Sequence, residues 1–258
     1  MMLKDQVAVI TGGGSGIGRA IARAFAKHQA CPVILDRNCD NARAVAGEIQ
    51  QEGGHARTVC ADVSLPAQVE AAFDEIRKRE GKVDILVNCA GVFVGKDAVT
   101  LEGAEWDRCF EINLKGAWTC SKYAIPLMIA AGGGSIINIG STHSVRTQGK
   151  AFPYGVTKAG LAALTRSLAV DFGRHGIRAN VICPGLVVTP LTLSIYSGER
   201  SPTLDQLIAR QPLPVQIQPD DIASAAVFLA SEMARCITGT EIFVDGGRTI
   251  SAGIDNPD

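Results

Sequence analysis

Short apolar runs alternate with longer helix-patterned segments along the whole chain, and this alternation restricts its possible folds more than any other feature. The apolar runs consist largely of Val and Ile, as in "QVAVIT" and "VDILVN", and contain few polar residues. Nearly continuous apolar runs are typical of strands that are buried on both faces, as in a parallel sheet. The expected strands cover residues 6–11, 32–36, 56–61, 83–88, 135–140, 178–183 and 241–245.

Helix-patterned segments fill the gaps between these strands. Ser64 is a candidate start signal for one of the helices, and Gly53 is a candidate stop signal for the helix before it. Strands that alternate with helices imply right-handed crossovers, so the pattern predicts an α/β fold with a doubly wound parallel sheet and helices on both faces. The expected helices cover residues 16–29, 40–52, 65–80, 104–131, 154–174 and 220–231.

Residues 1–258 show no linker, low-complexity tract or repeat, and we expect them to form a single domain. The one irregular region covers residues 189–219, where five prolines exclude a long helix. An insertion of this kind near the end of a sheet is more often a cap over a ligand than a separate domain. We therefore predict a substrate-capping segment there.

The charge and cysteine patterns exclude several classes of protein. The formal net charge is −1 with both signs interspersed, so neither nucleic acid nor an anionic membrane is an expected partner. No apolar run approaches the ~20 residues that span a bilayer, and the N-terminal segment lacks the apolar core of a signal peptide. The eight cysteines are scattered without a C-x-x-C pair, so we expect buried, reduced thiols in a cytoplasmic protein.

The first expected strand leads directly into a glycine-rich turn, "TGGGSGIGRAIARAFA". Gly12, Gly16 and Gly18 lie where the strand becomes a helix. A turn this tight brings backbone N–H groups and a helix N-terminus against a pyrophosphate without a Cβ in the way. Glycine also serves ordinary turns, but the position between the first strand and an amphipathic helix favours dinucleotide binding.

Asp36 ends the second expected strand. A carboxylate there can accept hydrogen bonds from the hydroxyls of an adenosine ribose, and it would repel a 2′-phosphate. Arg37 could instead pair with a 2′-phosphate, whereas Ser15, between the glycines, offers no second cation. A solvent-facing Asp in an ordinary turn is the alternative. The pattern predicts NAD in preference to NADP.

Tyr154 and Lys158 lie four residues apart in "AFPYGVTKAG", so on a helix they share one face. A cation beside a phenol favours the phenolate, and such a pair can transfer a proton. The spacing alone is common in proteins, and a surface accident is the alternative.

Eight motifs follow one another along the chain, and in this order they resemble the short-chain dehydrogenase/reductase family over essentially the whole length. The resemblance implies a single Rossmann-type domain with seven parallel strands, and an alcohol–carbonyl redox reaction on a nicotinamide cofactor without a metal. The motifs are T-G-x-x-x-G-x-G at 11–18, "ADV" at 61–63, "NCAG" at 88–91, "INLKG" at 112–116, "INIGS" at 137–141, Y-x-x-x-K at 154–158, "PGLVVTP" at 184–190 and "VDGG" at 244–247.

The family's catalytic residues correspond to Asn113, Ser141, Tyr154 and Lys158. The resemblance implies that Tyr154 exchanges the hydroxyl proton of the substrate and that Ser141 hydrogen-bonds the substrate oxygen. Lys158, with the cationic nicotinamide, would lower the pKa of the phenol and hold the nicotinamide ribose. Asn113 would open its helix to a water that relays protons to the lysine.

The resemblance also assigns residues to the cofactor. Asp62 and Val63 would contact adenine, residues 184–189 would hold the nicotinamide carboxamide, and Asn88 would brace the loop. The chain departs from the family at Cys89, where a second Asn is usual; we expect this position to be structural. The expected cofactor residues are Gly12, Ser15, Gly16, Ile17, Gly18, Asp36, Arg37, Asp62, Val63, Asn88, Ala90, Gly91, Tyr154, Lys158, Pro184, Gly185, Val187 and Thr189.

The substrate is the least specified part of the prediction. The loop between Ser141 and Tyr154 is polar, and His143 and Gln148 could contact the substrate or only solvent. Phe93 could supply an apolar wall. We expect a small polar secondary alcohol such as a sugar, polyol or hydroxy acid. A 3-oxoacyl-thioester reductase, a steroid or aliphatic alcohol dehydrogenase, and a catalytically silent nucleotide-binding regulator are the alternatives.

The helix expected at 154–174 carries few charges on any face. One side can pack on the sheet, and the remaining Ala and Leu surface needs a partner. Relatives pair this helix across a subunit interface, so the resemblance implies a homotetramer.

Overall fold

The fold is a seven-stranded parallel sheet in a computed structural model that describes residues 1–196 and 203–251. The strand order is β3-β2-β1-β4-β5-β6-β7, and every neighbouring pair is parallel. All seven expected strands are present. They are β1 (Val7–Thr11), β2 (Cys31–Asp36), β3 (Arg57–Cys60), β4 (Ile85–Asn88), β5 (Gly134–Ile139), β6 (Ile177–Pro184) and β7 (Glu241–Val244).

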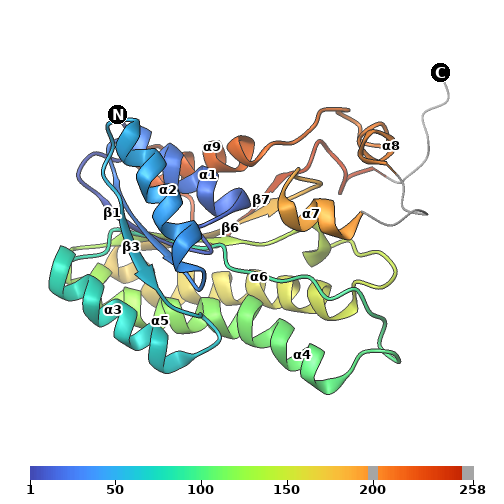
Figure 1. Cartoon of the computed structure of the whole chain (residues 1–258), viewed down its shortest axis with the longest axis horizontal. Coiled ribbons are helices and arrows are strands. Elements are labelled where there is room, and N and C mark those ends of the chain that lie inside the picture. The colour runs from blue at the N-terminus through green and yellow to red at the C-terminus, as the bar shows by residue number, and fades with distance from the viewer. Residues whose placement is uncertain (197–202, 252–258) are drawn as a thin grey trace.

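Helices cover both faces of the sheet, as the alternating pattern predicts. Figure 1 shows α1, α2 and α9 on one face and α3, α5 and α6 on the other. The helices are α1 (Gly16–Lys27), α2 (Cys39–Gln51), α3 (Pro66–Glu80), α4 (Gly103–Phe110), α5 (Gly116–Ala130), α6 (Phe152–Phe172), α7 (Pro190–Ile195), α8 (Leu204–Ile208) and α9 (Pro219–Ala230).

Alternate residues of the central strands enter two separate cores. In β1, Ile10 packs with Phe25 of α1 and Leu229 of α9, and it is fully buried. Its neighbour Val9 packs on the opposite face with Phe73 of α3. Strands that are apolar at every position are required here because both faces are covered. The two cores fix the carboxyl ends of the central strands at one edge of the sheet.

The segment expected as one helix over 104–131 is interrupted. A π-helical turn, Glu111–Lys115, separates α4 from α5 and places Asn113 at its centre. Ser64 does not start α3: Leu65 is its N-cap residue and Pro66 its first residue. Pro is favourable there because the first helical N–H has no partner within the helix. Gly53 follows the end of α2 with a φ of +83°, as a stop signal requires.

The expectation that all cysteines are buried thiols is wrong. Cys39 and Cys60 form a disulfide, because the pairing of β2 with β3 brings the start of α2 beside the end of β3. Their Cα atoms lie 5.4 Å apart. Cys109, Cys120 and Cys183 are buried free thiols, as expected, while Cys31 and Cys89 are partly exposed and Cys236 is exposed.

The irregular region at 189–219 contains α7 and α8, and part of it, 197–202, lies outside the described residues. Its two ends are joined, since the Val188 N–H donates to the carbonyl of Ile217 over 3.2 Å. Within residues 1–196 and 203–251, no helix is long and apolar enough to cross a membrane. The same residues contain no cluster of three or more His, Cys, Asp or Glu side chains that could hold a metal ion.

Candidate active site

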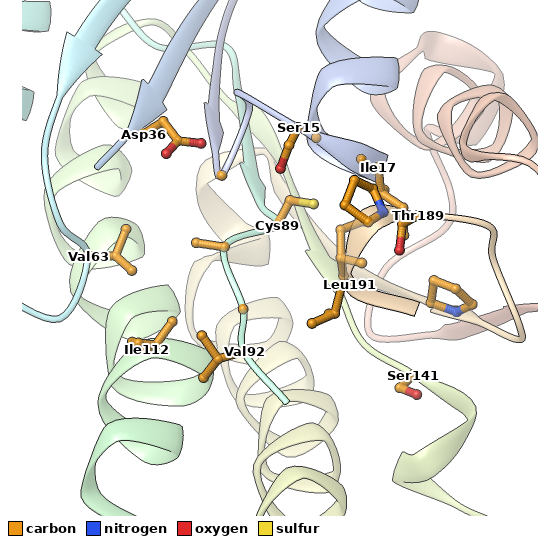
Figure 2. A pocket seen from close by; sticks show the side chains of 18 of the residues that line it. Ser15, Ile17, Asp36, Val63, Cys89, Val92, Ile112, Ser141, Thr189 and Leu191 are labelled. Atoms are coloured by element: carbon orange, nitrogen blue, oxygen red, sulfur yellow. The ribbon is translucent and has the colours of Figure 1, made fainter. Parts of the chain in front are cut away.

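A cavity of about 320 Å³ lies at the carboxyl ends of the strands. The strand order reverses between β1 and β4, and ligands of doubly wound sheets bind in the crevice at such a point. Figure 2 shows Asp36 and Ser141 at two ends of this cavity, with Cys89 and Leu191 between them. The cavity therefore joins the end of β2 to the end of β5.

The glycine-rich turn forms one wall of the cavity. Gly12 has a φ of +65°, and a Cβ on Gly18 would lie 2.3 Å from the carbonyl oxygen of Gly12. Ser15 is the N-cap residue of α1 in extended conformation, and its side chain caps no N–H of the helix. The first N–H groups of α1 are thus left for an anionic ligand. This wall fits a pyrophosphate.

Asp36 is held at the end of β2 by backbone donors. Its Oδ2 accepts a hydrogen bond from the N–H of Gly14 and its Oδ1 one from the N–H of Asn38, each over 2.9 Å. Val63 and Asp62 lie on the same side of the cavity, and Asp62 accepts from Ser64. Arg37 also lines the cavity and is exposed.

Ser141, Tyr154 and Lys158 meet at the other end of the cavity. The hydroxyl of Ser141 lies close enough to Tyr154 to lower the pKa of the phenol, and it accepts from the N–H of His143 over 3.2 Å. Lys158 is buried, donates from Nζ to the carbonyl of Ile139 over 2.7 Å, and lies 5.5 Å from the centroid of the Tyr154 ring. Residues from β5 and α6 thus place a phenol between a hydroxyl and an ammonium.

Burial is the largest influence on the pKa values of Tyr154 and Lys158. Burial raises the pKa of Tyr154 to about 12, while the hydrogen bond from Ser141 lowers it. Burial also lowers the pKa of Lys158 below its ordinary value. We expected Lys158 to lower the phenol pKa. That expectation concerns the complex with the cationic nicotinamide, and it stays a prediction.

Asn113 lies behind the cavity and not in its wall. Its Oδ1 accepts from the N–H of Val92 over 2.8 Å, and its Nδ2 donates to the Val92 carbonyl over 3.0 Å and to Thr157 Oγ1 over 3.1 Å. A Cβ on Gly91 would lie 3.4 Å from Asn113 Oδ1 and 3.7 Å from Lys158 Nζ. Asn113 and Lys158 therefore converge on the same glycine.

Comparison with known proteins decides the family. The family model described as "Enoyl-(Acyl carrier protein) reductase" matches residues 12–249, which is most of the chain. The D-threitol dehydrogenase of Mycolicibacterium smegmatis is 38% identical over 248 residues, covering 96% of this chain and 94% of that protein. The chain belongs to the short-chain dehydrogenase/reductase family. It is an oxidoreductase that acts on CH–OH groups with a nicotinamide cofactor.

Two further relatives are similar to this chain over nearly its whole length. The cis-4-hydroxycyclohexanecarboxylate dehydrogenase of Sinomonas cyclohexanicum is 38% identical, covering 95% of this chain and 97% of that protein. A gluconate 5-dehydrogenase of Burkholderia cenocepacia, solved with NADP and tartrate, superposes with a TM-score of 0.91. It is 36% identical, and the match covers 97% of this chain and 98% of that one.

The structure of the dehydrogenase brings most of the predicted site residues together. Asn88 is buried away from the cavity, where its side chain donates to Asn138 and Ser121. Gln148 is exposed and does not line the cavity. The predicted residues that line it are Gly12, Ser15, Gly16, Ile17, Gly18, Asp36, Arg37, Asp62, Val63, Ala90, Gly91, Ser141, Tyr154, Lys158, Pro184, Gly185, Val187 and Thr189.

Phe93 and His143 flank Tyr154 outside the lining of the cavity. The ring centroid of Phe93 lies 5.2 Å from that of Tyr154, and the ring of His143 meets Tyr154 edge-on at 5.5 Å. His143 Nδ1 also lies 3.2 Å from Thr147 Oγ1. Burial and, to a smaller extent, the positive charge of Arg248 lower the pKa of His143.

Sequence reasoning missed several residues of the cavity wall. Most are direct neighbours of predicted residues at strand ends, so the strand-end position was the available signal. Cys89 is the chemically distinct member, and burial raises the pKa of its thiol to about 12. The missed residues are Leu35, Ala61, Cys89, Val92, Ile112, Ile139 and Gly140, whereas Pro190 and Leu191 lie in the predicted capping segment 189–219.

Proposed function

We propose that this dehydrogenase transfers a hydride between NAD(H) and a small polar secondary alcohol or its ketone, with Tyr154 as the general acid and base. The observation that carries the proposal is the arrangement along one cavity of a glycine-rich turn, Asp36, and the group of Ser141, Tyr154 and Lys158. The turn and Asp36 fit an adenosine diphosphate, and the group at the far end fits a reacting C–O bond.

The residues present fit a dinucleotide. The uncapped start of α1 suits a pyrophosphate, and the Asp36 carboxylate suits a ribose diol. The nicotinamide, when bound, supplies or accepts the hydride. Asp36 supports NAD, because its charge repels a 2′-phosphate. Arg37 and the NADP in the Burkholderia cenocepacia gluconate 5-dehydrogenase support NADP. We favour NAD because Asp36 is hydrogen-bonded to the glycine-rich turn at Gly14, whereas Arg37 is exposed.

The side chains at the far end have separate roles in this proposal. Tyr154 takes the substrate hydroxyl proton in oxidation and returns it in reduction. Ser141, which lies beside Tyr154 in the cavity wall, would donate to the substrate oxygen as charge develops on it. Lys158 would hold the nicotinamide ribose and favour the phenolate. Asn113 would relay protons to Lys158 through a water, which its place beside Gly91 supports.

A polar substrate is supported by two observations. The relatives include dehydrogenases named for threitol, a hydroxycyclohexanecarboxylate and gluconate. His143 lies beside Tyr154 and can pair with a substrate hydroxyl, and Phe93 can form an apolar wall on the other side. Gln148 would reach the substrate only if its loop folded toward the cavity. Residues 189–219 would cap the substrate, because Thr189, Pro190 and Leu191 already line the cavity.

A 3-oxoacyl-thioester reductase is the second candidate. The description of the matching family model, an enoyl-(acyl carrier protein) reductase, favours acyl thioesters. Leu191 and Leu193 of α7 are exposed and offer apolar surface to an acyl chain. A steroid or aliphatic alcohol would use the same surface. Against these candidates stands Asp36, since thioester reductases of this family usually take NADPH.

Initial rates on a substrate panel test the proposal. Polyols, hydroxy acids, aliphatic alcohols, steroids and acyl thioesters are assayed with NAD(H) and NADP(H), and each polar substrate is paired with its deoxygenated analogue. We expect a polar substrate with NAD(H) to give the highest kcat/KM. Its deoxygenated analogue should react more slowly, because it leaves polar groups of the site without a hydrogen-bond partner. Steroids or thioesters that outrun every polar alcohol would overturn the substrate assignment.

Tyr154→Phe is the control for the mechanism. It should lower kcat by ~10²- to 10⁴-fold with little change in cofactor affinity, because only the proton-transfer group is removed. Lys158→Ala should impair both kcat and cofactor affinity. Turnover of Tyr154→Phe within a few-fold of the unmutated enzyme would refute the assigned chemistry.

We also propose that the enzyme is a homotetramer. Exposed apolar side chains gather on two separate parts of the molecule. One is a stripe on α6 that includes Phe152, Val156 and Val170, and the other surrounds the edge strand β7 at Leu213 and Phe243. Two self-complementary surfaces, each paired across a two-fold axis, generate a tetramer.

A further inference from the structure

A buried hydroxyl joins the three segments that surround the proton-transfer group. Thr157 lies directly before Lys158 in the first turns of α6 and is fully buried. Its Oγ1 donates to the carbonyl of Tyr154 over 2.7 Å and accepts from Asn113 Nδ2 over 3.1 Å. Cys109 Sγ lies 3.9 Å from the same oxygen.

The donor and acceptor roles in this cluster are determined by counting hydrogens. A threonine hydroxyl has one hydrogen, and that hydrogen is used on the Tyr154 carbonyl. Towards Asn113 the hydroxyl can therefore only accept, so the amide must present its NH₂ to α6. Its Oδ1 is then left for the N–H of Val92, which the structure shows over 2.8 Å.

The amide of Asn113 thus connects two walls of the site. Through Val92 it holds the chain that follows β4 and lines the cavity, and through Thr157 it holds the start of α6. All three segments, including the π-helical turn that carries Asn113, come from distant parts of the sequence. A displacement of about 1 Å between reacting groups can lower a rate by about 10²-fold, so the relative positions of these three segments affect the rate.

We infer that Thr157 is a positioning residue: its hydroxyl fixes the orientation of the Asn113 amide and holds the turn that carries Tyr154 and Lys158 against the cavity wall at Val92. The inference rests on the proposed role of Tyr154. It assigns no contact between Thr157 and substrate or cofactor.

The chain contains a matched control. Thr165, two turns further along α6, is equally buried, donates from Oγ1 to the Leu161 carbonyl over 2.8 Å, and accepts from Asn138 Nδ2 over 2.8 Å. Its surroundings are therefore chemically the same, but it does not touch the group around Tyr154. Thr157→Val and Thr165→Val remove the same hydroxyl with the same change of shape.

The test compares Thr157→Val, Thr157→Ser and Thr165→Val in the full-length enzyme. We expect Thr157→Val to lower kcat about tenfold or more with unchanged affinity for NADH, measured by fluorescence titration. Thr157→Ser should recover kcat to within about threefold, because it retains the hydroxyl. Thr165→Val should lower the thermal stability by about as much as Thr157→Val, but its kcat should stay within about threefold of that of the unmutated enzyme. If Thr157→Val does not fold, Thr157→Ala is the second hydroxyl-free variant.

A double-mutant cycle with Asn113→Ala separates positioning from a general loss of stability. In the Asn113→Ala background we expect Thr157→Val to lower kcat by less than about threefold, since the partner of the hydroxyl is already absent. The inference is overturned by equal losses in both backgrounds, by a Thr157→Ser variant as slow as Thr157→Val, or by a fully active Thr157→Val. If Tyr154→Phe also keeps its turnover, the proposed function itself has failed.

Discussion

At the scale of single residues, desolvation and hydrogen bonding act on Tyr154 in opposite directions. Burial raises the pKa of the phenol to about 12, and Ser141 lowers it. The reduction reaction needs the phenol, which a high pKa favours at neutral pH. The oxidation reaction needs the phenolate, which the same environment disfavours. A raised phenol pKa thus favours proton donation over proton abstraction.

This asymmetry predicts different pH profiles for the two directions. Below the phenol pKa the phenolate fraction rises with pH, so kcat/KM for alcohol oxidation should increase continuously from about pH 6 to 10. The phenol remains the main form over the same range, so kcat/KM for ketone reduction should stay flat and fall only at the alkaline end. Initial rates in both directions with one alcohol–ketone pair measure this. An oxidation rate that is constant over this range contradicts it.

Asp36 carries the prediction on cofactor choice. NAD(H) should be preferred over NADP(H) by about tenfold or more in kcat/KM, equivalent to about 1.4 kcal/mol. Asp36→Asn preserves the size of the side chain but removes its charge, so it should improve kcat/KM for NADP(H). Asp36→Ala should in addition weaken NAD(H), because the ribose acceptor is lost. Arg37→Ala is the control and should impair only NADP(H). Equal use of both cofactors by the unmutated enzyme would show that Arg37 outweighs Asp36.

At the scale of elements, local pattern was enough to predict every strand of the sheet and every long helix except the one at 104–131. Apolar runs and helical periodicity are local properties, and right-handed crossovers between them favour a doubly wound parallel sheet. The π-helical turn at Asn113 could not be predicted from the local pattern, because Asn113 bonds to Val92 and Thr157, which are 21 and 44 residues away in the sequence. The Cys39–Cys60 disulfide depends in the same way on the register of β2 against β3.

The candidate site, like the fold, could be predicted only in part from the sequence. Most residues at strand ends and in the glycine-rich turn were predicted, partly from the turn itself and mainly through the family resemblance. The surroundings of Tyr154 were not, because the orientation of His143 and the desolvation of the phenol depend on packing between β5, α6 and the loop that joins them. Spacing could indicate that Tyr154 and Lys158 share a face, but not how deeply the phenol is buried.

Two glycines in helices give opposite predictions for the stability of their elements. A Cβ on Gly47, in the interior of α2, would meet no atom within 4 Å, so Gly47→Ala should raise the free energy of unfolding by about 0.5–1 kcal/mol. A Cβ on Gly18 would meet the Gly12 carbonyl at 2.3 Å, so Gly18→Ala should lower it by about 1–3 kcal/mol and weaken cofactor binding. Urea unfolding and NADH titration measure both. A stabilised Gly18→Ala would contradict the close turn.

At the scale of the whole molecule, the surface of α6 is the feature that a monomer does not explain. Val156 and Val170 lie on its exposed side, and Val170 is 81% exposed. Ala159 and Ala163 lie between them in the same stripe and are also exposed. Small and apolar side chains along a 21-residue helix, interrupted by the exposed Arg166 and Ser167, allow two helices to approach closely. A second copy of the chain, paired helix to helix, would remove this surface from water.

Val170→Glu should therefore break one of the two interfaces and convert the tetramer to a dimer, since it places unpaired charges in a closed apolar contact. Light scattering coupled to size-exclusion chromatography measures the mass. Val99→Glu is the matched control: Val99 is 93% exposed in the chain between β4 and α4, outside both proposed surfaces, and its substitution should leave the mass unchanged. Because the edge around β7 is untouched, the dimer should persist at concentrations where the unmutated enzyme is a tetramer. A monomeric unmutated enzyme, or an unchanged mass for Val170→Glu, would exclude α6 as an interface.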